Sequence, residues 1–312
     1  MPISIDRQKT GNFGTLEFRA RQEVEGFITG LHKSPYHGFS VEFAEHRVYN
    51  KGESMRHVDW KLFAKTDKYF IKKYDEETNL RCQIVIDISS SMYYPDNPDY
   101  SKDKFDKIGF SVYAAAALIR LMQKQRDAVG LSVFDDKIEL HLEPKSNSLH
   151  IHHLYQNLEE LITPKKEQIF NKKSFAVSAI HEIAERIHKR SLVIIFSDLM
   201  DNSGSDESIF EALQHLRYYK HDVVLFGVFD SKYEINLDYE NRPRTFVDRE
   251  TGEKIKLNPV SVKDFYRENM NRYIHDLEMK CGQYEIDFVQ CDVNEGFHLI
   301  LMQYLVKRQR LY

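Results

Sequence analysis

The sequence has few cysteines and no excess of charge of one sign, and each shortage argues against a class of protein. There are 3 cysteines in 312 residues, Cys82, Cys281 and Cys291, and no two of them form a CxxC pair. This pattern predicts reduced structural thiols. The formal net charge is -4 and both signs are interspersed, so a polyelectrolyte partner such as nucleic acid is not indicated.

Long apolar runs are missing as well. The run "YAAAALIRLM" (113–122) contains Arg120 and is shorter than the roughly 20 residues that cross a bilayer. The start, "MPISIDRQKTGNFG", has no apolar core of the kind that a signal peptide needs. We therefore expect a cytoplasmic protein without a membrane span.

Common enzyme motifs are absent too. The sequence has no GxSxG nucleophile elbow, no P-loop and no GxGxxG. It therefore offers no catalytic motif, and we expect a protein that is not an enzyme.

Apolar residues make up 42% of the sequence, which is enough for a large core, and after residue 80 strands and helices alternate. Strands are expected over 82–88, 128–136, 137–144, 191–198, 222–230 and 284–292, and helices over 105–125, 148–162, 175–189, 206–219, 261–280 and from about 294. Continuous apolar runs such as "LVIIF" and "VVLFGVF" indicate strands that are covered on both faces. The pattern predicts an α/β fold, a doubly wound and mostly parallel sheet.

The composition and the pattern of the sequence change near residue 80. Residues 1–80 are expected to form a small N-terminal subdomain, with a helix over 14–34 and an irregular or β-containing part after it. Residues 81–312 are expected to form the α/β domain, with a hairpin insertion near 240–260 that turns at Thr251 and Gly252.

The segment "CQIVIDISSSM" (82–92) carries the candidate site, because a buried strand ends in Asp87 and hydroxyls follow at Ser89 and Ser91. Asp198 ends another apolar strand. Ligands of open α/β sheets bind at the carboxyl ends of strands, where the strand order reverses. Such an oxygen-rich site suits Mg²⁺, or Mn²⁺ or Ca²⁺. Alternatively, the serines cap the next helix and Asp87 accepts backbone hydrogen bonds.

"DISSSM" resembles the first motif of the metal-ion-dependent adhesion site of von Willebrand factor A domains. That resemblance implies that Ser89 and Ser91 bind the metal directly, while Asp87 and Asp198 act largely through water. The family takes a threonine from a second loop, and Ser174 in "KKSFAVSAI" is the candidate there. The glycines that flank the family's threonine are missing, and Ser174 is equally suited to be a helix N-cap.

The segment "EFAEHRVYNKGESMRHVDWK" (42–61) strongly resembles the bacterial domain of unknown function 58 family, which places such a segment before a von Willebrand factor A-like domain. The similarity is close over roughly 32–92, and the rest of the chain is similar in its pattern. It implies a MoxR-type AAA+ ATPase as partner and an adaptor role in protein-complex maturation.

Together these features predict a divalent-metal-dependent interaction module that binds an acidic side chain of the ATPase or of its client. One alternative is a metal-dependent hydrolase that uses the same cluster. A haloacid dehalogenase-like phosphatase would need a second aspartate where Ser89 stands. Another alternative is a structural scaffold whose metal site has decayed.

Overall fold

The structure is a computed structural model, which describes residues 15–33, 46–48, 65, 69–72, 80–163, 176–200 and 206–311. Most of the segment 42–61 and the candidate ligand Ser174 lie outside the described residues. The chain forms two compact units. Gly26–Asn79 make one, and Met1–Glu25 with Leu80–Tyr312 make the other.

In the smaller unit, two short strands pair antiparallel. They are β1 (His46–Val48) and β2 (Phe70–Lys72), with Arg47 opposite Ile71.

A six-stranded sheet forms the centre of the larger unit. Its strands are β3 (Arg81–Asp87), β4 (Ala128–Phe134), β5 (Ile138–Lys145), β6 (Leu192–Ser197), β7 (Asp222–Phe229) and β10 (Asp287–Asp292). The order is β10-β7-β6-β3-β4-β5, and the only antiparallel pair is β4 with β5. This confirms the doubly wound α/β prediction. The chain leaves β3 toward one edge and returns to the other side at β6, so the switch point lies between these two strands.

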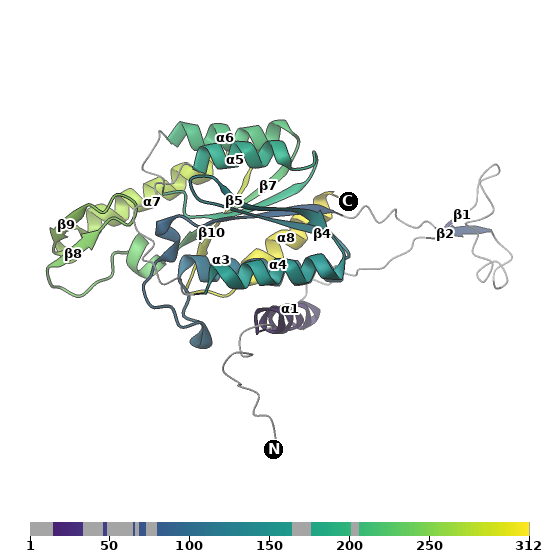
Figure 1. Cartoon of the computed structure of the whole chain (residues 1–312), viewed down its shortest axis with the longest axis horizontal. Coiled ribbons are helices and arrows are strands. Elements are labelled where there is room, and N and C mark those ends of the chain that lie inside the picture. The colour runs from purple at the N-terminus through teal and green to yellow at the C-terminus, as the bar shows by residue number, and fades with distance from the viewer. Residues whose placement is uncertain are drawn as a thin grey trace, which may run out of the picture. The chain divides into compact units, whose positions relative to one another are not determined.

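Helices cover both faces of the sheet, as continuous apolar strands require. They are α3 (Lys107–Lys124), α4 (Ser148–Leu161), α5 (Ala176–Arg186), α6 (Asp206–Tyr218), α7 (Pro259–Gln283) and α8 (His298–Leu311). Helices α5 and α6 lie on one face, and α3 and α4 lie on the other (Figure 1). Every residue of β6 is buried, because its side chains point alternately into the two layers.

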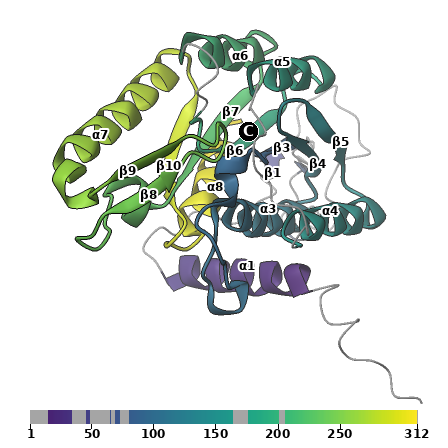
Figure 2. The same cartoon turned by 60° about the vertical axis from the view of Figure 1, so that its left-hand side comes forward.

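The first part of helix α1 (Thr15–Lys33) packs against the helices of the larger unit, beside α3 and α4 (Figure 2). Its residues Leu16, Ala20 and Val24 recur every fourth position and are buried. Arg19 adds a hydrogen bond from Nη1 to the backbone oxygen of Tyr100 at 2.5 Å. The sequence predicted this helix but did not indicate the surface on which it packs.

The insertion after β7 begins with a short π-helix, η4 (Ser231–Ile235), and continues as a hairpin of β8 (Arg244–Val247) and β9 (Lys254–Leu257). The hairpin turns at Gly252, which has a φ of 74°, so the predicted turn is confirmed. Helix α7 follows and runs along this side of the unit (Figure 2).

Several predicted boundaries were wrong by a few residues; helix α5, for example, ends at Arg186 rather than at 189, and α7 extends to Gln283 rather than to 280. Strand β10 starts at Asp287 rather than at 284, because Tyr284 still caps α7 and Glu285 has a φ of 56°. Helix α8 starts at His298 rather than near 294. The three cysteines are free and buried, as expected of structural thiols.

Candidate metal centre

The carboxylate of Asp87 lies at the switch point and joins its two strands. It is the last residue of β3, and its Oδ1 accepts a hydrogen bond from the backbone N–H of Ser89 at 2.8 Å. Its Oδ2 accepts one from the hydroxyl of Ser197, the last residue of β6, at 2.6 Å. Both strand ends are therefore fixed around one acidic group.

The other predicted residues meet beside it. The hydroxyl oxygens of Ser89 and Ser91 are 3.1 Å apart, and the Ser91 side chain is near enough to Asp198 to help lower the pKa of that carboxyl. Asp87, Ser89 and Asp198 are at most 3% exposed, whereas Ser91 is partly exposed. The structure thus brings together the four predicted residues that it describes, and solvent reaches them on the side of Ser91.

The helix-cap interpretation of the serines fits only in part. Ser89 is the N-cap of the short 3-10 helix η2 (Ser90–Tyr93), yet its side chain makes no capping hydrogen bond. Asp87 does accept a backbone N–H, as that interpretation expected. The Ser89 hydroxyl hydrogen-bonds to the hydroxyl of Ser91 rather than to the backbone of the first turn.

A lysine that the sequence analysis missed lies in the same cluster. The ammonium of Lys107 is fully buried and lies 2.7 Å from Oδ2 of Asp198 and 2.5 Å from Oε1 of Glu234. Lys107 is the first residue of α3 and Glu234 belongs to η4, so the lysine connects the candidate site to the insertion. The sequence signal for a buried lysine was its place at the start of the apolar helix "KIGFSVYAAAALI".

The charges in the cluster are strongly coupled. Burial, followed by the negative charge of Asp198, raises the pKa of Asp87 to about 7. Burial also acts on Asp198, but the charge and hydrogen bond of Lys107 outweigh it and hold the pKa of Asp198 below its ordinary value. Burial alone would lower the pKa of Lys107, and the charges of Asp198 and Glu234 raise it instead.

The residues present fit a small divalent cation. The cluster holds the carboxylates of Asp87, Asp198 and Glu234, and the ammonium of Lys107 pairs with the last two, so part of the negative charge is left uncompensated. Carboxylate and hydroxyl oxygens are ligands suited to Mg²⁺. Within the described part of the chain, no group of three or more His, Cys, Asp or Glu could hold a metal, so serine hydroxyls would have to contribute.

Two further acidic strand ends have structural partners. Oδ1 of Asp230, after β7, accepts the backbone N–H groups of Lys232 and Tyr233. Oδ1 of Asp292, at the end of β10, accepts the backbone N–H of Asn294 at 3.0 Å. These two carboxylates close turns and do not join the cluster around Asp87.

The sequence profile of the family described as "Protein of unknown function DUF58" matches residues 45–276, which is more than half of the chain. The chain belongs to the DUF58 family. Curated relatives include "Uncharacterized protein Rv1480" of Mycobacterium tuberculosis and "Uncharacterized protein Mb1516" of Mycobacterium bovis. Each is 24% identical over 186 residues, which are 60% of this DUF58 chain and 56% of the relative. The chain thus matches little more than half the length of these relatives.

Solved structures similar to this DUF58 chain include the conserved hypothetical protein BatB of Bacteroides thetaiotaomicron, with a TM-score of 0.47 and 17% identity over 74% of this chain and 99% of that one. Another is an aerotolerance-related membrane protein of Bacteroides fragilis, with a TM-score of 0.46 and 16% identity over 73% and 99% of the two chains. Among the described residues of this chain, no helix has the length and apolarity needed to cross a membrane.

Proposed function

We propose that this DUF58 protein is a divalent-cation-dependent protein-interaction module of the von Willebrand factor A-like type. The observation that carries the proposal is the convergence of Asp87, Ser89, Ser91 and Asp198 at the switch point of the sheet. A bound Mg²⁺, Mn²⁺ or Ca²⁺ would offer a coordination position to a carboxylate of a partner protein.

The residues of the chain would prepare this recognition before the partner arrives. Ser197 and the Ser89 backbone hold Asp87 in place, and Lys107 holds Asp198. Both aspartates are buried, so the ligand oxygens are fixed by the fold and lose little freedom on binding. Ser91 lies on the accessible side and marks where the partner would approach.

The resemblance to the domain of unknown function 58 family supports a MoxR-type AAA+ ATPase, or a client of it, as the partner. In this proposal the protein is a cytoplasmic adaptor in protein-complex maturation. An acidic side chain of the partner would contact the cation, and Ser174 would be a further ligand.

Burial favours this role over the hydrolase alternative. Asp87 is 3% exposed, and both of its oxygens already accept hydrogen bonds. A carboxylate that acts as a nucleophile or a general base must reach its substrate directly or through one water. A carboxylate that supports a cation from inside the fold has no such requirement.

Recovery of the MoxR-type ATPase on the immobilised protein tests the proposal. We expect recovery in Mg²⁺ to be lost in EDTA and in Asp87→Asn, and to persist in Asp136→Asn, which changes an exposed aspartate of the β4–β5 turn. Equal recovery with and without EDTA would show that a cation does not bridge the two proteins.

A further inference from the structure

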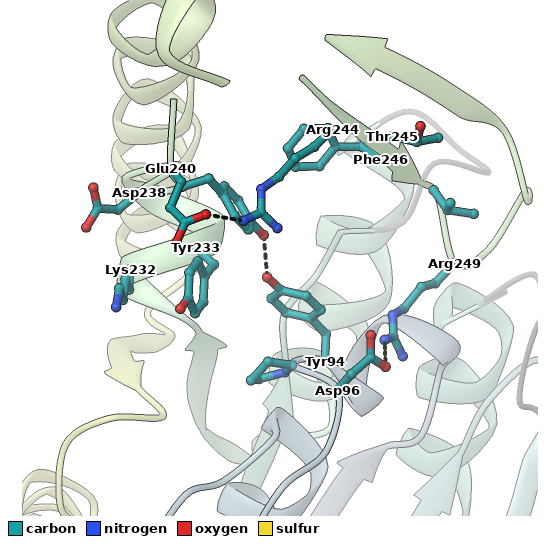
Figure 3. Close-up of a pocket in the computed structure, with 13 residues that line it drawn as sticks. Tyr94, Asp96, Lys232, Tyr233, Asp238, Glu240, Arg244, Thr245, Phe246 and Arg249 are labelled. Carbon is teal, nitrogen blue, oxygen red and sulfur yellow. Dashed lines mark hydrogen bonds and ion pairs between the residues drawn. The ribbon is translucent and has the colours of Figure 1, made fainter. Parts of the chain in front are cut away.

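A pocket with a volume of about 1060 Å³ lies where the insertion meets the loop that follows the candidate metal centre (Figure 3). Tyr94, Pro95 and Asp96 form one wall, and the residues after β7 with strand β8 form the others. The volume slightly exceeds the range of roughly 300–1,000 Å³ that is usual for small-molecule sites. The pocket therefore has room for several residues of an extended chain.

The surfaces of this pocket are aromatic. Tyr94 and Tyr239 both line the pocket, and their hydroxyl oxygens are 2.6 Å apart. Tyr233 packs beside Tyr239 with ring centroids 4.9 Å apart, and Phe246 meets Tyr239 edge-on at 5.4 Å. Such rigid aromatic faces bind peptide side chains with a small loss of conformational freedom.

The uncompensated charge of the pocket is positive. Arg244 is stacked over the ring of Tyr239, 5.1 Å from its centroid, and is one-third exposed. Its Nε is buried and has no hydrogen-bond partner in the described structure, and its Nη2 forms a long ion pair with Glu240 at 3.6 Å, beyond hydrogen-bond distance. Lys232 lies over the ring of Tyr233 and has no carboxylate partner among the described residues. The stacked guanidinium is thus held in place with donors left for an acceptor.

The acidic residues of the lining are neutralised by other cations. Asp238 pairs with Lys263 at 2.9 Å, and Asp96 pairs with Arg249. Glu240 lies closer to Arg242, at 2.8 Å, than to Arg244. A ligand entering the pocket therefore meets Arg244 and Lys232, and charge complementarity favours an acidic one.

The pocket is continuous with the candidate metal centre through two contacts. Arg249 Nη1 donates to the backbone oxygen of Tyr93, the last residue of η2, at 3.0 Å. Glu234 lies in the same short helix as Lys232 and Tyr233, and it reaches Asp198 through Lys107. A partner segment anchored near Ser91 would therefore have this pocket beside it.

We infer that this pocket binds an extended segment of a partner protein in which acidic residues are next to aromatic ones. One carboxylate of the segment coordinates the cation, and a second lies against Arg244. The aromatic side chains of the segment pack on the tyrosines. This inference rests on the proposed cation-dependent role, and it adds the kind of partner sequence that the protein selects.

Fluorescence anisotropy with a labelled decapeptide of alternating glutamate and tyrosine tests the inference. We expect binding in Mg²⁺ and at least tenfold weaker binding to Arg244→Gln, because a charge-assisted hydrogen bond contributes roughly 1.5–3 kcal/mol. Arg272→Gln is the matched control, since Arg272 forms an exposed ion pair with Glu268 on α7 and neither residue lines the pocket. Its affinity should change by less than about twofold, the scale of an exposed ion pair. Circular dichroism and Tm check that both variants are folded.

The outcomes separate the pocket from the cation. If Arg244→Gln and Arg272→Gln bind the peptide equally well and binding is still lost in EDTA, the role of the pocket is wrong and the role of the cation stands. If Arg244→Gln binds the peptide more weakly and EDTA has no effect, the role of the pocket stands and the role of the cation is wrong. Equal binding of a glutamine–tyrosine decapeptide, no peptide binding at all, or binding of ATP in place of the peptide would each overturn an acidic protein segment as the ligand.

Discussion

At the scale of single residues, Lys107 changes the interpretation of the acidic site. A buried ammonium already neutralises part of the charge of Asp198 and Glu234, so this end of the cluster is held together without an added ion. The charge that remains uncompensated is centred on Asp87, whose pKa is raised to about 7 first by burial and then by Asp198. The cation is therefore expected to act mainly on Asp87 and the serines.

Replacing Lys107 with methionine should destabilise the protein strongly. The change leaves two carboxylates without their buried cation, and breaking a buried pair from one side costs about 3–5 kcal/mol. Urea unfolding measures the loss. Lys137→Met removes an exposed ion pair to Glu139 and should cost less than about 1 kcal/mol. A loss in Lys107→Met as small as in this control would contradict the structural role of Lys107.

The pKa of Asp87 predicts a pH dependence with a definite sign. In the folded chain its pKa is raised to about 7 from 3.8, so between these values the folded state keeps a proton that the unfolded state has released. Stability in EDTA should then fall as the pH rises through this window, and the full loss should be present above it. Each unit of the pKa difference corresponds to about 1.4 kcal/mol.

Urea unfolding of wild type and Asp87→Asn at a series of pH values isolates this effect. The stability of the wild type relative to Asp87→Asn should decrease from pH values near the ordinary pKa of aspartate to pH values above about 7. Saturating Mg²⁺ should oppose the decrease, because a cation favours the ionised carboxylate. Parallel profiles of the two proteins in EDTA would contradict the raised pKa.

At the scale of elements, the switch point brings residues together that are far apart in the sequence. Parallel strands β3 and β6 end side by side, so Asp87 and Ser197 come within hydrogen-bond distance across the edge. Strand β5 departs from the parallel pattern, and its pairing with β4 shifts register between Val129 and Leu131. Gly130 lies at this irregularity.

Gly130→Ala should destabilise the sheet by about 1–3 kcal/mol, the usual cost of overpacking. An added Cβ would be 2.5 Å from the backbone oxygen of Leu142 and 2.3 Å from Oε1 of Gln83, and the backbone oxygen cannot move without shifting β5. The control is Gly282→Ala in α7, where the Cβ meets nothing within 4 Å. That change should be neutral or stabilise by up to about 1 kcal/mol. Thermal unfolding of both variants measures the difference. Equal Tm values would contradict the close approach of Leu142 and Gln83 to Gly130.

The sequence was sufficient to predict the sheet and one side of the site. Continuous apolar runs identify buried strands, and the carboxyl ends of parallel strands share an edge, so Asp87 and Asp198 could be placed together. Lys107 and Glu234 could not be placed, because a lysine in the first turn of a helix is usually exposed and η4 has no apolar periodicity. The position of Arg244 could not be predicted either, because it depends on how the hairpin folds back toward Tyr94, and local sequence patterns do not encode that.

At the scale of the whole molecule, the net charge explains why an acidic partner would need a local site. The chain carries a formal charge of -4, so its overall field does not attract an acidic protein. The cation site and the cluster of Lys232 and Arg244 would supply positive charge at one place on the larger unit. This separation would make recognition specific, since acidic proteins would not accumulate elsewhere on the surface.

The most direct test of the cation-dependent site is the Tm of the protein measured against free Mg²⁺, starting from EDTA. The Tm of the wild type should rise with Mg²⁺, because binding at 100 times the Kd adds about 2.7 kcal/mol of stability. The double variant Ser89→Ala and Ser91→Ala should show no rise, whereas Ser101→Ala, which removes an exposed hydroxyl, should respond like the wild type. A wild-type Tm that is the same in EDTA and in Mg²⁺, or a rise that persists in the double variant, would contradict the cation site.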